Sequence, residues 1–406
     1  MMDPKAQVRF LDRTTPPHIM TLVLMAGIAA MNMSAFLPSL PGMAVYFDTE
    51  YEVMQLSVSL YLAVNALLQL FIGPIADRFG RRITTLTCLS IFVVATIGCI
   101  LATSVEVFLF FRMLQGVVAV GIVLSRAIVR DIVPQNEAAS MIGYVTMGMA
   151  LVPMVAPMIG GALDAAFDWH ATFIFLLVGG VGVLALCWAD QGETSLGSQM
   201  SFRDQFREYP ELLRSKRFWG YVFSAAFASG AFFAFLGGAP WIASNIYGLS
   251  SFEAGIGFGA PAIGYAIGNG VSGRFSVRFG VNWMVRTGAT IAVLGLSLAT
   301  ILAIAGLDNA YIFFGCCTFV GLGNGMVIPN ASAGLLSVRP HLAGTASGLG
   351  SFFMIGGGAA LSVIAGIVLK FGGGSLPLLL LMTTSVLFGL VSVLYVIKRE
   401  NEITAI

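Results

Sequence analysis

Apolar residues occur along this chain in about a dozen long runs separated by short polar stretches. Each run holds roughly 20 residues, the length that an α-helix needs to cross the hydrocarbon core of a bilayer. We therefore predict an all-α membrane protein with twelve transmembrane helices, at about 18–37, 54–73, 83–103, 107–127, 138–161, 170–189, 218–237, 253–272, 283–305, 310–330, 345–369 and 376–397. The connections are short, except for 190–217 in the middle of the chain.

Positive charge tests this prediction, because the cytoplasmic loops of membrane proteins carry an excess of Lys and Arg. Of the 21 Lys and Arg residues, all but Lys370, Arg112 and Arg126 fall in the termini or in loops on one side. Lys370 belongs to the other side, and the two arginines lie within the fourth span. Adding or removing one span would destroy this bias. Both termini are therefore predicted to be cytoplasmic.

The stretch Gly73–Arg82, between the second and third spans, holds three arginines and one carboxylate, and we predict a tight turn at a water-facing surface. A shift of 200 residues aligns it with Gly273–Asn282, where Val277 replaces Asp77. This repeat predicts two pseudo-symmetric six-helix bundles, 1–189 and 218–406, with a substrate cavity between them. The linker 190–217 contains Ser201–Tyr209, which either forms an amphipathic helix on the membrane surface or serves as a solvated tether.

Composition narrows the functional classes. The 406 residues are 57% hydrophobic and 10% charged, with a mean hydropathy of +0.89. A net charge of +1 without a basic face argues against nucleic acid as a partner. The five cysteines lie in apolar runs without a C-x-x-C pair, so we expect them to pack rather than bind metal. No G-x-x-x-x-G-K-[ST] loop is present, which argues against transport driven by ATP.

Several motifs resemble those of the major facilitator superfamily. The stretch Gly73–Arg82 is similar to its signature between helices 2 and 3, and Phe111–Gly116 in helix 4 resembles the RxxQG element of its drug–proton antiporters. Gly148 and Ala156–Gly161 resemble the antiporter motif of helix 5. Three further strings are similar to the bicyclomycin/chloramphenicol-resistance (Bcr/CflA-type) subfamily, at Phe36–Pro41, Val129–Pro134 and His341–Ser347.

The resemblance implies a proton-driven exporter of small drugs or metabolites in a bacterial inner membrane, which we expect to be a monomer. It assigns a cytoplasmic gate to Gly73, Asp77, Arg78, Gly80 and Arg81, with Asp77 bonding to nearby arginines and to the start of helix 11. It assigns the antiporter motif to Pro153, Pro157, Gly160 and Gly161. One departure is Ser34, which stands where the subfamily has an acid in helix 1.

Arg112 is the sharpest candidate for a coupling role. It lies about six residues inside helix 4, roughly 9 Å deep, where a charge normally faces a cavity or a partner. Either it tunes a proton-binding group or it braces the helix carbonyls. Asn32 and Ser34 lie at a similar depth in helix 1 and could bond Arg112 or the substrate. Further candidates for the substrate and coupling path are Gln115, Tyr61, Asn65 and Asn324, each with a purely structural alternative.

Arg126 follows Arg112 by 14 residues and lies about 40° away around the helix, so both point to one side. Near the cytoplasmic interface, snorkelling is the simpler interpretation of Arg126, and an electropositive cavity entrance is the other. No carboxylate is predicted in mid-membrane, which leaves Glu106 and Glu253 as proton-site candidates. Both have a simple alternative, because acids are favoured at helix N-termini.

We predict a secondary transporter rather than an enzyme, without a bound cofactor or metal, that uses the proton gradient to export small amphipathic compounds. One alternative is an exporter dedicated to one endogenous metabolite. An anion would suit two helix-4 arginines without a mid-membrane acid. The other is a non-transporting membrane sensor, although the chain lacks a soluble signalling domain.

Overall fold

The computed structural model describes residues 8–132, 152, 155–194, 210–339 and 343–404. These residues are almost wholly helical. The first half contains α1 (Ile19–Ser34), α2 (Leu40–Tyr46), α3 (Tyr51–Phe79), α4 (Arg81–Ile100), α5 (Val105–Leu114), α6 (Val120–Ile132), a helix at Val155–Ala166 and α8 (Trp169–Asp190). The second half contains α10 (Lys216–Trp241), α11 (Ser251–Phe279), α12 (Val281–Ile304), α13 (Ala310–Ser337), α14 (Ala343–Leu369) and α15 (Leu376–Thr404).

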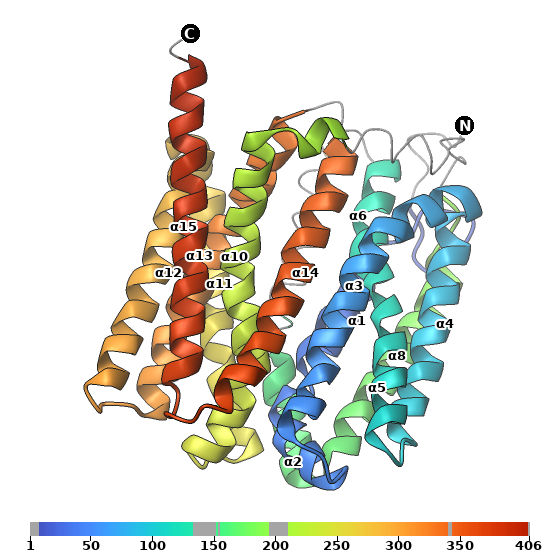
Figure 1. Cartoon of the computed structure of the whole chain (residues 1–406). Coiled ribbons are helices and arrows are strands. Elements are labelled where there is room, and N and C mark those ends of the chain that lie inside the picture. Colours follow the sequence, from blue (N-terminus) through green and yellow to red (C-terminus); the bar gives the residue numbers. More distant parts are fainter. Residues whose placement is uncertain (1–7, 133–151, 153–154, 195–209, 340–342, 405–406) are drawn as a thin grey trace.

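Among these described residues, ten helices are long and apolar enough to cross a membrane. Two predicted spans fall outside that set for separate reasons. The fifth is described only in part, as the apolar helix Val155–Ala166, and the eighth, α11, is long but rich in glycine. In Figure 1 the helices of the first half stand together, the helices of the second half stand beside them, and both termini lie at one end. We call this end the terminal end and the other the opposite end.

The first span is a broken helix. Its regular part stops at Ser34, a 3-10 turn follows at Leu37–Ser39, and α2 continues the run to Tyr46. Pro38 and Pro41 explain the break, because proline has no N–H to donate and its ring clashes with the preceding turn. The predicted span 18–37 was therefore too short. The break leaves the last carbonyls of α1 without helical donors, so they can accept hydrogen bonds from side chains.

The predicted ten-residue turn at Gly73–Arg82 was wrong in its extent. Helix α3 continues through Gly73 and Pro74 to Phe79, and Gly80 alone forms the turn, with φ of 99°. The 29 residues of α3 span about 44 Å, more than the roughly 30 Å of hydrocarbon, so Asp77 and Arg78 reach water while remaining helical. The second copy has the same form, because Gly280 turns with φ of 85° between α11 and α12.

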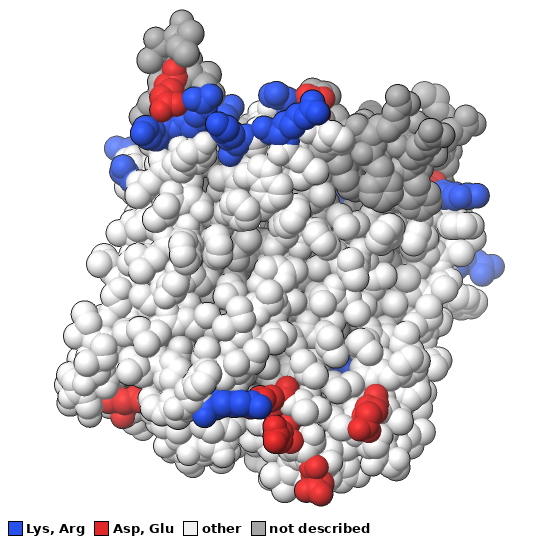
Figure 2. All heavy atoms as spheres, viewed as in Figure 1, with Lys and Arg blue, Asp and Glu red and all other residues white. Residues whose placement is uncertain are grey.

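Charge is sorted between the two ends of the molecule. Figure 2 shows Lys and Arg gathered at the terminal end, while acidic side chains predominate at the opposite end and the band between them is nearly uncharged. This pattern is that of a protein whose middle lies in hydrocarbon and whose two ends lie in water. The linker segment 201–209, predicted as an amphipathic helix or a tether, lies outside the described residues.

Glycine allows α11 and α13 to approach closely within the second half. A Cβ atom at Gly321 of α13 would overlap the carbonyl group of Pro261, and one at Gly264 of α11 would overlap the carbonyl of Thr318. Gly315, also on α13, faces open space instead. Small residues at such crossings bring helix backbones into van der Waals contact, which drives association within a membrane.

We expect Gly321→Ala to destabilise the second half by roughly 1–3 kcal/mol, because the added methyl group must push two helix backbones apart. Gly315→Ala is the matched control on the same helix and should leave stability unchanged or slightly raised, since alanine has the higher helix propensity. Thermal melting of the purified variants in detergent measures the difference. Equal melting temperatures for Gly321→Ala and Gly315→Ala would contradict the close packing.

Candidate functional site

The guanidinium of Arg112 is enclosed between the helices of the first half, and the residue is 1% exposed. Its Nη1 donates to Oδ1 of Asn32 at 2.9 Å and to Oε1 of Gln115 at 2.6 Å. Its Nη2 donates to the main-chain oxygen of Asn32 at 2.8 Å, and its Nε to that of Ser57 at 3.3 Å. Four of the five N–H groups of this arginine are therefore used within the protein.

Helix 1 provides the Asn32 carbonyl because α1 ends two residues later. This oxygen is among the last four carbonyls of the helix, which have no intrahelical donor, so it is free to accept from Arg112. The local break at Pro38 and the buried charge are thus two parts of one arrangement. Depth along the helix predicts the pairing of Asn32 with Arg112, but it does not predict the role of the helix break.

Two aromatic rings cover the faces of the same guanidinium. The Cζ atom of Arg112 lies 4.2 Å from the ring centroid of Phe36 and 4.4 Å from that of Tyr61. Gln115 extends the network, because its Nε2 donates to the hydroxyl of Thr96 in α4 at 2.8 Å. Arg112, in α5, therefore joins α1 and α3 directly and α4 through Gln115. Phe36 and Thr96 were not among the predicted site residues.

The charge of Arg112 is stabilised without an acid. Placing an arginine in the middle of a membrane costs about 3 kcal/mol or more, and hydrogen bonds to a charged group contribute roughly 1.5–3 kcal/mol each. Four bonds and two aromatic faces are of the size needed to offset that cost. No described carboxylate contacts the guanidinium, so its hydrogen-bond acceptors among the described residues are all neutral groups.

The other predicted residues are more dispersed. The hydroxyl of Ser34 donates to the Ala30 carbonyl at 3.3 Å and does not reach Arg112. Asn65, one turn beyond Tyr61 on α3, accepts from Gln69 at 2.9 Å. Asn324 lies buried in α13 of the second half, with its Oδ1 atom unpartnered.

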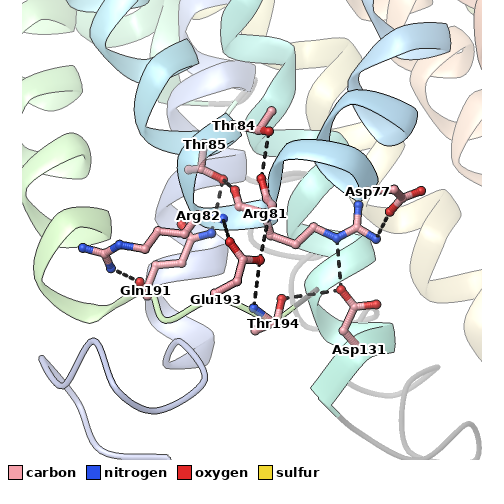
Figure 3. A network of polar contacts seen from close by, with 10 residues as sticks. Asp77, Arg81, Arg82, Thr84, Thr85, Asp131, Gln191, Glu193 and Thr194 are labelled. Carbon is pink, nitrogen blue, oxygen red and sulfur yellow. Dashed lines mark hydrogen bonds and ion pairs between the residues drawn. The ribbon is translucent and has the colours of Figure 1, made fainter. Parts of the chain in front are cut away.

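The predicted gate residues form an ion-pair network at the terminal end (Figure 3). Arg81, the first residue of α4, lies between two carboxylates. Its Nη2 is 2.6 Å from Oδ1 of Asp77, and its Nε is 3.0 Å from Oδ2 of Asp131 in α6. Asp131 was not predicted as a gate residue, although it lies in one of the strings that resemble the subfamily. Arg78 instead stacks on the ring of Phe79, with its Cζ 5.5 Å from the centroid.

Glu193, just beyond α8, caps the N-terminus of α4. Its carboxylate accepts from the main-chain N–H of Arg81 at 2.7 Å and of Arg82 at 3.2 Å (Figure 3). Arg82 reciprocates by donating to the carbonyls of Trp188 and Gln191 at the end of α8. A Cβ atom at Gly80 would overlap the Glu193 carboxylate, so this position requires glycine for its space as well as for its positive φ. The predicted bond from Asp77 to the start of helix 11 concerns a region that includes residues 340–342, outside the described part.

Polar contacts join the two halves at the opposite end. The hydroxyl of Tyr51 donates to the Gly237 carbonyl at 2.8 Å, and Nε2 of Gln55 donates to the hydroxyl of Ser362 at 3.0 Å. Lys370, after α14, forms an ion pair with Glu52 at the start of α3. Among the described residues, no ion pair at the terminal end joins the first half to the second. The polar closure that the structure shows is therefore at the opposite end.

The helix-5 motif supports this closure through its small residues. A Cβ atom at Gly160 would overlap the Ala35 carbonyl in the first span, and one at Gly161 would overlap the carbonyl of Ser251 in the second half. Pro157 approaches Gly255 of α11 through its carbonyl oxygen. The motif thus lies where the helix Val155–Ala166 meets the end of the first span and the start of α11. Pro153, the remaining predicted member, lies outside the described residues.

The acids proposed for proton transfer lie at helix starts. Glu253 accepts from both the N–H and the hydroxyl of Ser250, which forms a capping box at the start of α11. Glu106 lies in the first turn of α5. Outside the predicted set, Asp190 is fully buried and accepts from Leu11 N–H at 2.7 Å and from the Thr21 hydroxyl at 2.6 Å, which fastens the N-terminal segment to the end of α8.

A family model for the Major Facilitator Superfamily matches residues 22–363 and, in a second match, 237–405. The chain belongs to the major facilitator superfamily. A chloramphenicol resistance protein of Pseudomonas aeruginosa is 30% identical over 332 residues, covering 81% of this chain and 78% of that protein. Multidrug resistance protein D of Escherichia coli (strain K12) is 29% identical over 364 residues, covering 89% and 91%.

A solved structure agrees with this membership at the level of the fold. A bacterial homolog of the human lysosomal transporter Spinster, in an inward-facing and unoccupied conformation, matches with a TM-score of 0.71. The match covers 93% of this chain and 95% of that one, at 19% identity. Together the comparisons confirm the multi-pass membrane fold of two six-helix bundles and the resemblance to the bicyclomycin/chloramphenicol-resistance branch.

Proposed function

We propose that this chain is a secondary exporter of small amphipathic, drug-like compounds in a bacterial inner membrane. The observation that carries the proposal is the enclosed guanidinium of Arg112, held among the first four membrane spans in a chain of the major facilitator superfamily. Relatives named for chloramphenicol and multidrug resistance support export of drugs. The chain acts as a monomeric carrier rather than an enzyme, moving its substrate without covalent chemistry.

Alternating access follows from the two ends of the fold. The gathering of Lys and Arg at the terminal end supports a cytoplasmic location for both termini (Figure 2). The polar contacts that join the halves at the opposite end then support an inward-facing state, sealed toward the outside by Tyr51, Gln55 and Lys370. Transport requires these contacts to break while the terminal end closes around the gate network.

Proton exchange is the proposed energy source, and its support is the family resemblance. The described acids lie at helix ends or in loops, and none contacts Arg112. A second candidate function is export of one anionic metabolite. It is favoured by Arg112 and Arg126 in the fourth span and by the lack of a mid-membrane carboxylate among the described residues.

Efflux from proteoliposomes tests the proposal. We expect a pH gradient to accelerate export of neutral and cationic amphipathic compounds at least several-fold over the rate without a gradient, because proton influx would drive the cycle. Protein-free liposomes are the control for passive leakage. Transport that is restricted to anions would favour the metabolite exporter, and a rate indifferent to the gradient would remove proton exchange.

A further inference from the structure

Arg126 differs from Arg112 because none of its side-chain atoms forms a hydrogen bond with another described residue. It lies in α6, within the fourth span, and its Nε atom is enclosed without any hydrogen bond. No ion pair or hydrogen bond of its side chain occurs among the described residues. Asp131, the acid that follows it on the same helix, is engaged with Arg81 instead. The residue as a whole is partly buried, so its Nε–H is enclosed and unsatisfied while part of the side chain stays accessible.

The helix geometry points the Cα–Cβ bond of Arg126 toward the membrane interior. Cα–Cβ bonds in a helix tilt toward its N-terminus, and the fourth span begins at the opposite end. The first bond of the Arg126 side chain therefore points away from the terminal end and toward the middle of the bilayer. Snorkelling, the simpler expectation from sequence, would require the reverse direction and an exposed head group. The enclosed, unpartnered Nε supports the other expectation, a positive charge at the entrance to a cavity.

The second half faces the same charge. Arg126 lies close enough to Tyr265 of α11 to interact with it electrostatically, although the two residues belong to different halves of the molecule. The interface between the halves is where this fold binds its substrate. Arg126 thus offers a positive charge to that interface from the first half, about 21 Å along the helix from Arg112.

An enclosed, unsatisfied N–H of a charged group is costly in such a position. Leaving a polar group buried without a partner costs about 1–3 kcal/mol, and more when the group is charged. A planar oxyanion matches the fork of N–H groups on a guanidinium and can accept two parallel hydrogen bonds. Binding of such a group would satisfy the enclosed Nε–H and neutralise the positive charge beside it.

We propose that Arg126 binds an anionic group, such as a carboxylate, on amphipathic compounds that this chain moves. The inference rests on the proposed export function and narrows its substrates. Compounds with one apolar body and one oxyanion are bound in preference to their neutral counterparts, and Arg126 is the residue that makes the distinction.

Binding of a matched pair of compounds to the purified full-length protein tests this inference. We would measure equilibrium binding of 1-naphthaleneacetate and its neutral carboxamide by scintillation proximity at pH 7.5, where the acid is ionised. The wild type is expected to bind the carboxylate about tenfold or more tighter, as a charge-assisted hydrogen bond implies. In Arg126→Gln the ratio of the two dissociation constants should fall toward one, and in Arg126→Lys it should keep an intermediate value.

Arg286→Gln is the matched control, because Arg286 is an exposed cation of α12 near the terminal end. It should keep the wild-type ratio, and melting curves verify that each variant is folded. Equal binding of both compounds by the wild type, or an unchanged ratio in folded Arg126→Gln, would overturn this inference alone. Binding of neither compound would overturn it too, and loss of efflux of neutral drugs as well would count against the exporter itself.

Discussion

Arg112→Gln is expected to reduce efflux at least 100-fold and to lower the melting temperature by several degrees. The variant removes the charged donor from Asn32, Gln115 and Ser57, and unsatisfied acceptors in a membrane interior cost about 1–3 kcal/mol each. It also removes the cation between Phe36 and Tyr61. Helices α1, α3 and α5 then lose the group that fixes their relative positions.

Arg112→Lys separates charge from geometry. Lysine keeps the positive charge but cannot present the same fork of donors to the two oxygens of Asn32 and to the oxygens of Gln115 and Ser57. We therefore expect efflux to remain strongly reduced. Thr96→Val is the control, since it removes only the outermost bond of the network and should cost no more than a few-fold. Efflux by Arg112→Lys at the wild-type rate would show that charge alone suffices.

Efflux and stability need separate measurement, because a structural role and a coupling role of Arg112 predict different combinations of transport rate and melting temperature. Accumulation assays in cells, normalised to surface abundance, measure transport. Melting of the purified protein measures how much Arg112 contributes to stability. A stable Arg112→Gln protein without transport would assign the residue to coupling. An unstable protein whose remaining folded fraction transports normally would assign it to structure alone.

The sequence predicts how deep each residue of this site lies in the membrane, but it does not predict how neighbouring helices are rotated. Depth along a helix can be counted in residues, and that count pairs Asn32 with Arg112 correctly. The rotation of each helix relative to its neighbours cannot be derived from residue counts. The contacts of Arg112 with Phe36 and Ser57, and the link through Gln115 to Thr96, were therefore not predicted. Ser34 illustrates the same limit, because it has the right depth but bonds to its own helix.

The predicted extent of the turn near Gly80 was wrong for another reason. The prediction assumed that charged residues need a loop. A helix that is longer than the bilayer is thick places them in water while they remain helical. The repeat of 200 residues was the more reliable signal, because glycine is required by the same positive φ at Gly80 and Gly280. Asp131 and Glu193 were missed because their partnership with Arg81 depends on how neighbouring helices meet at the terminal end.

Asp77→Asn is expected to leave membrane insertion and folding intact while reducing efflux at least tenfold. Arg81 would still be paired with Asp131, and Glu193 would still cap α4, so the turn keeps its supports. The Asp77 side chain is 39% exposed, and a pair of that exposure contributes no more than about 1 kcal/mol to stability.

Transport should depend on the charge of Asp77 for a different reason. The half-exposed carboxylate is available at the terminal end to accept from the free N–H groups at the start of a helix on the other half when that end closes. An amide is a weaker acceptor for that partial positive charge, so the closed state would be less populated. Asp12→Asn is the control, an acid at the same end that has no ion pair among the described residues. Normal efflux by Asp77→Asn at normal surface abundance would defeat this account of the gate, whereas a selective loss would identify the first copy of the repeat, with its single acid, as the side that closes.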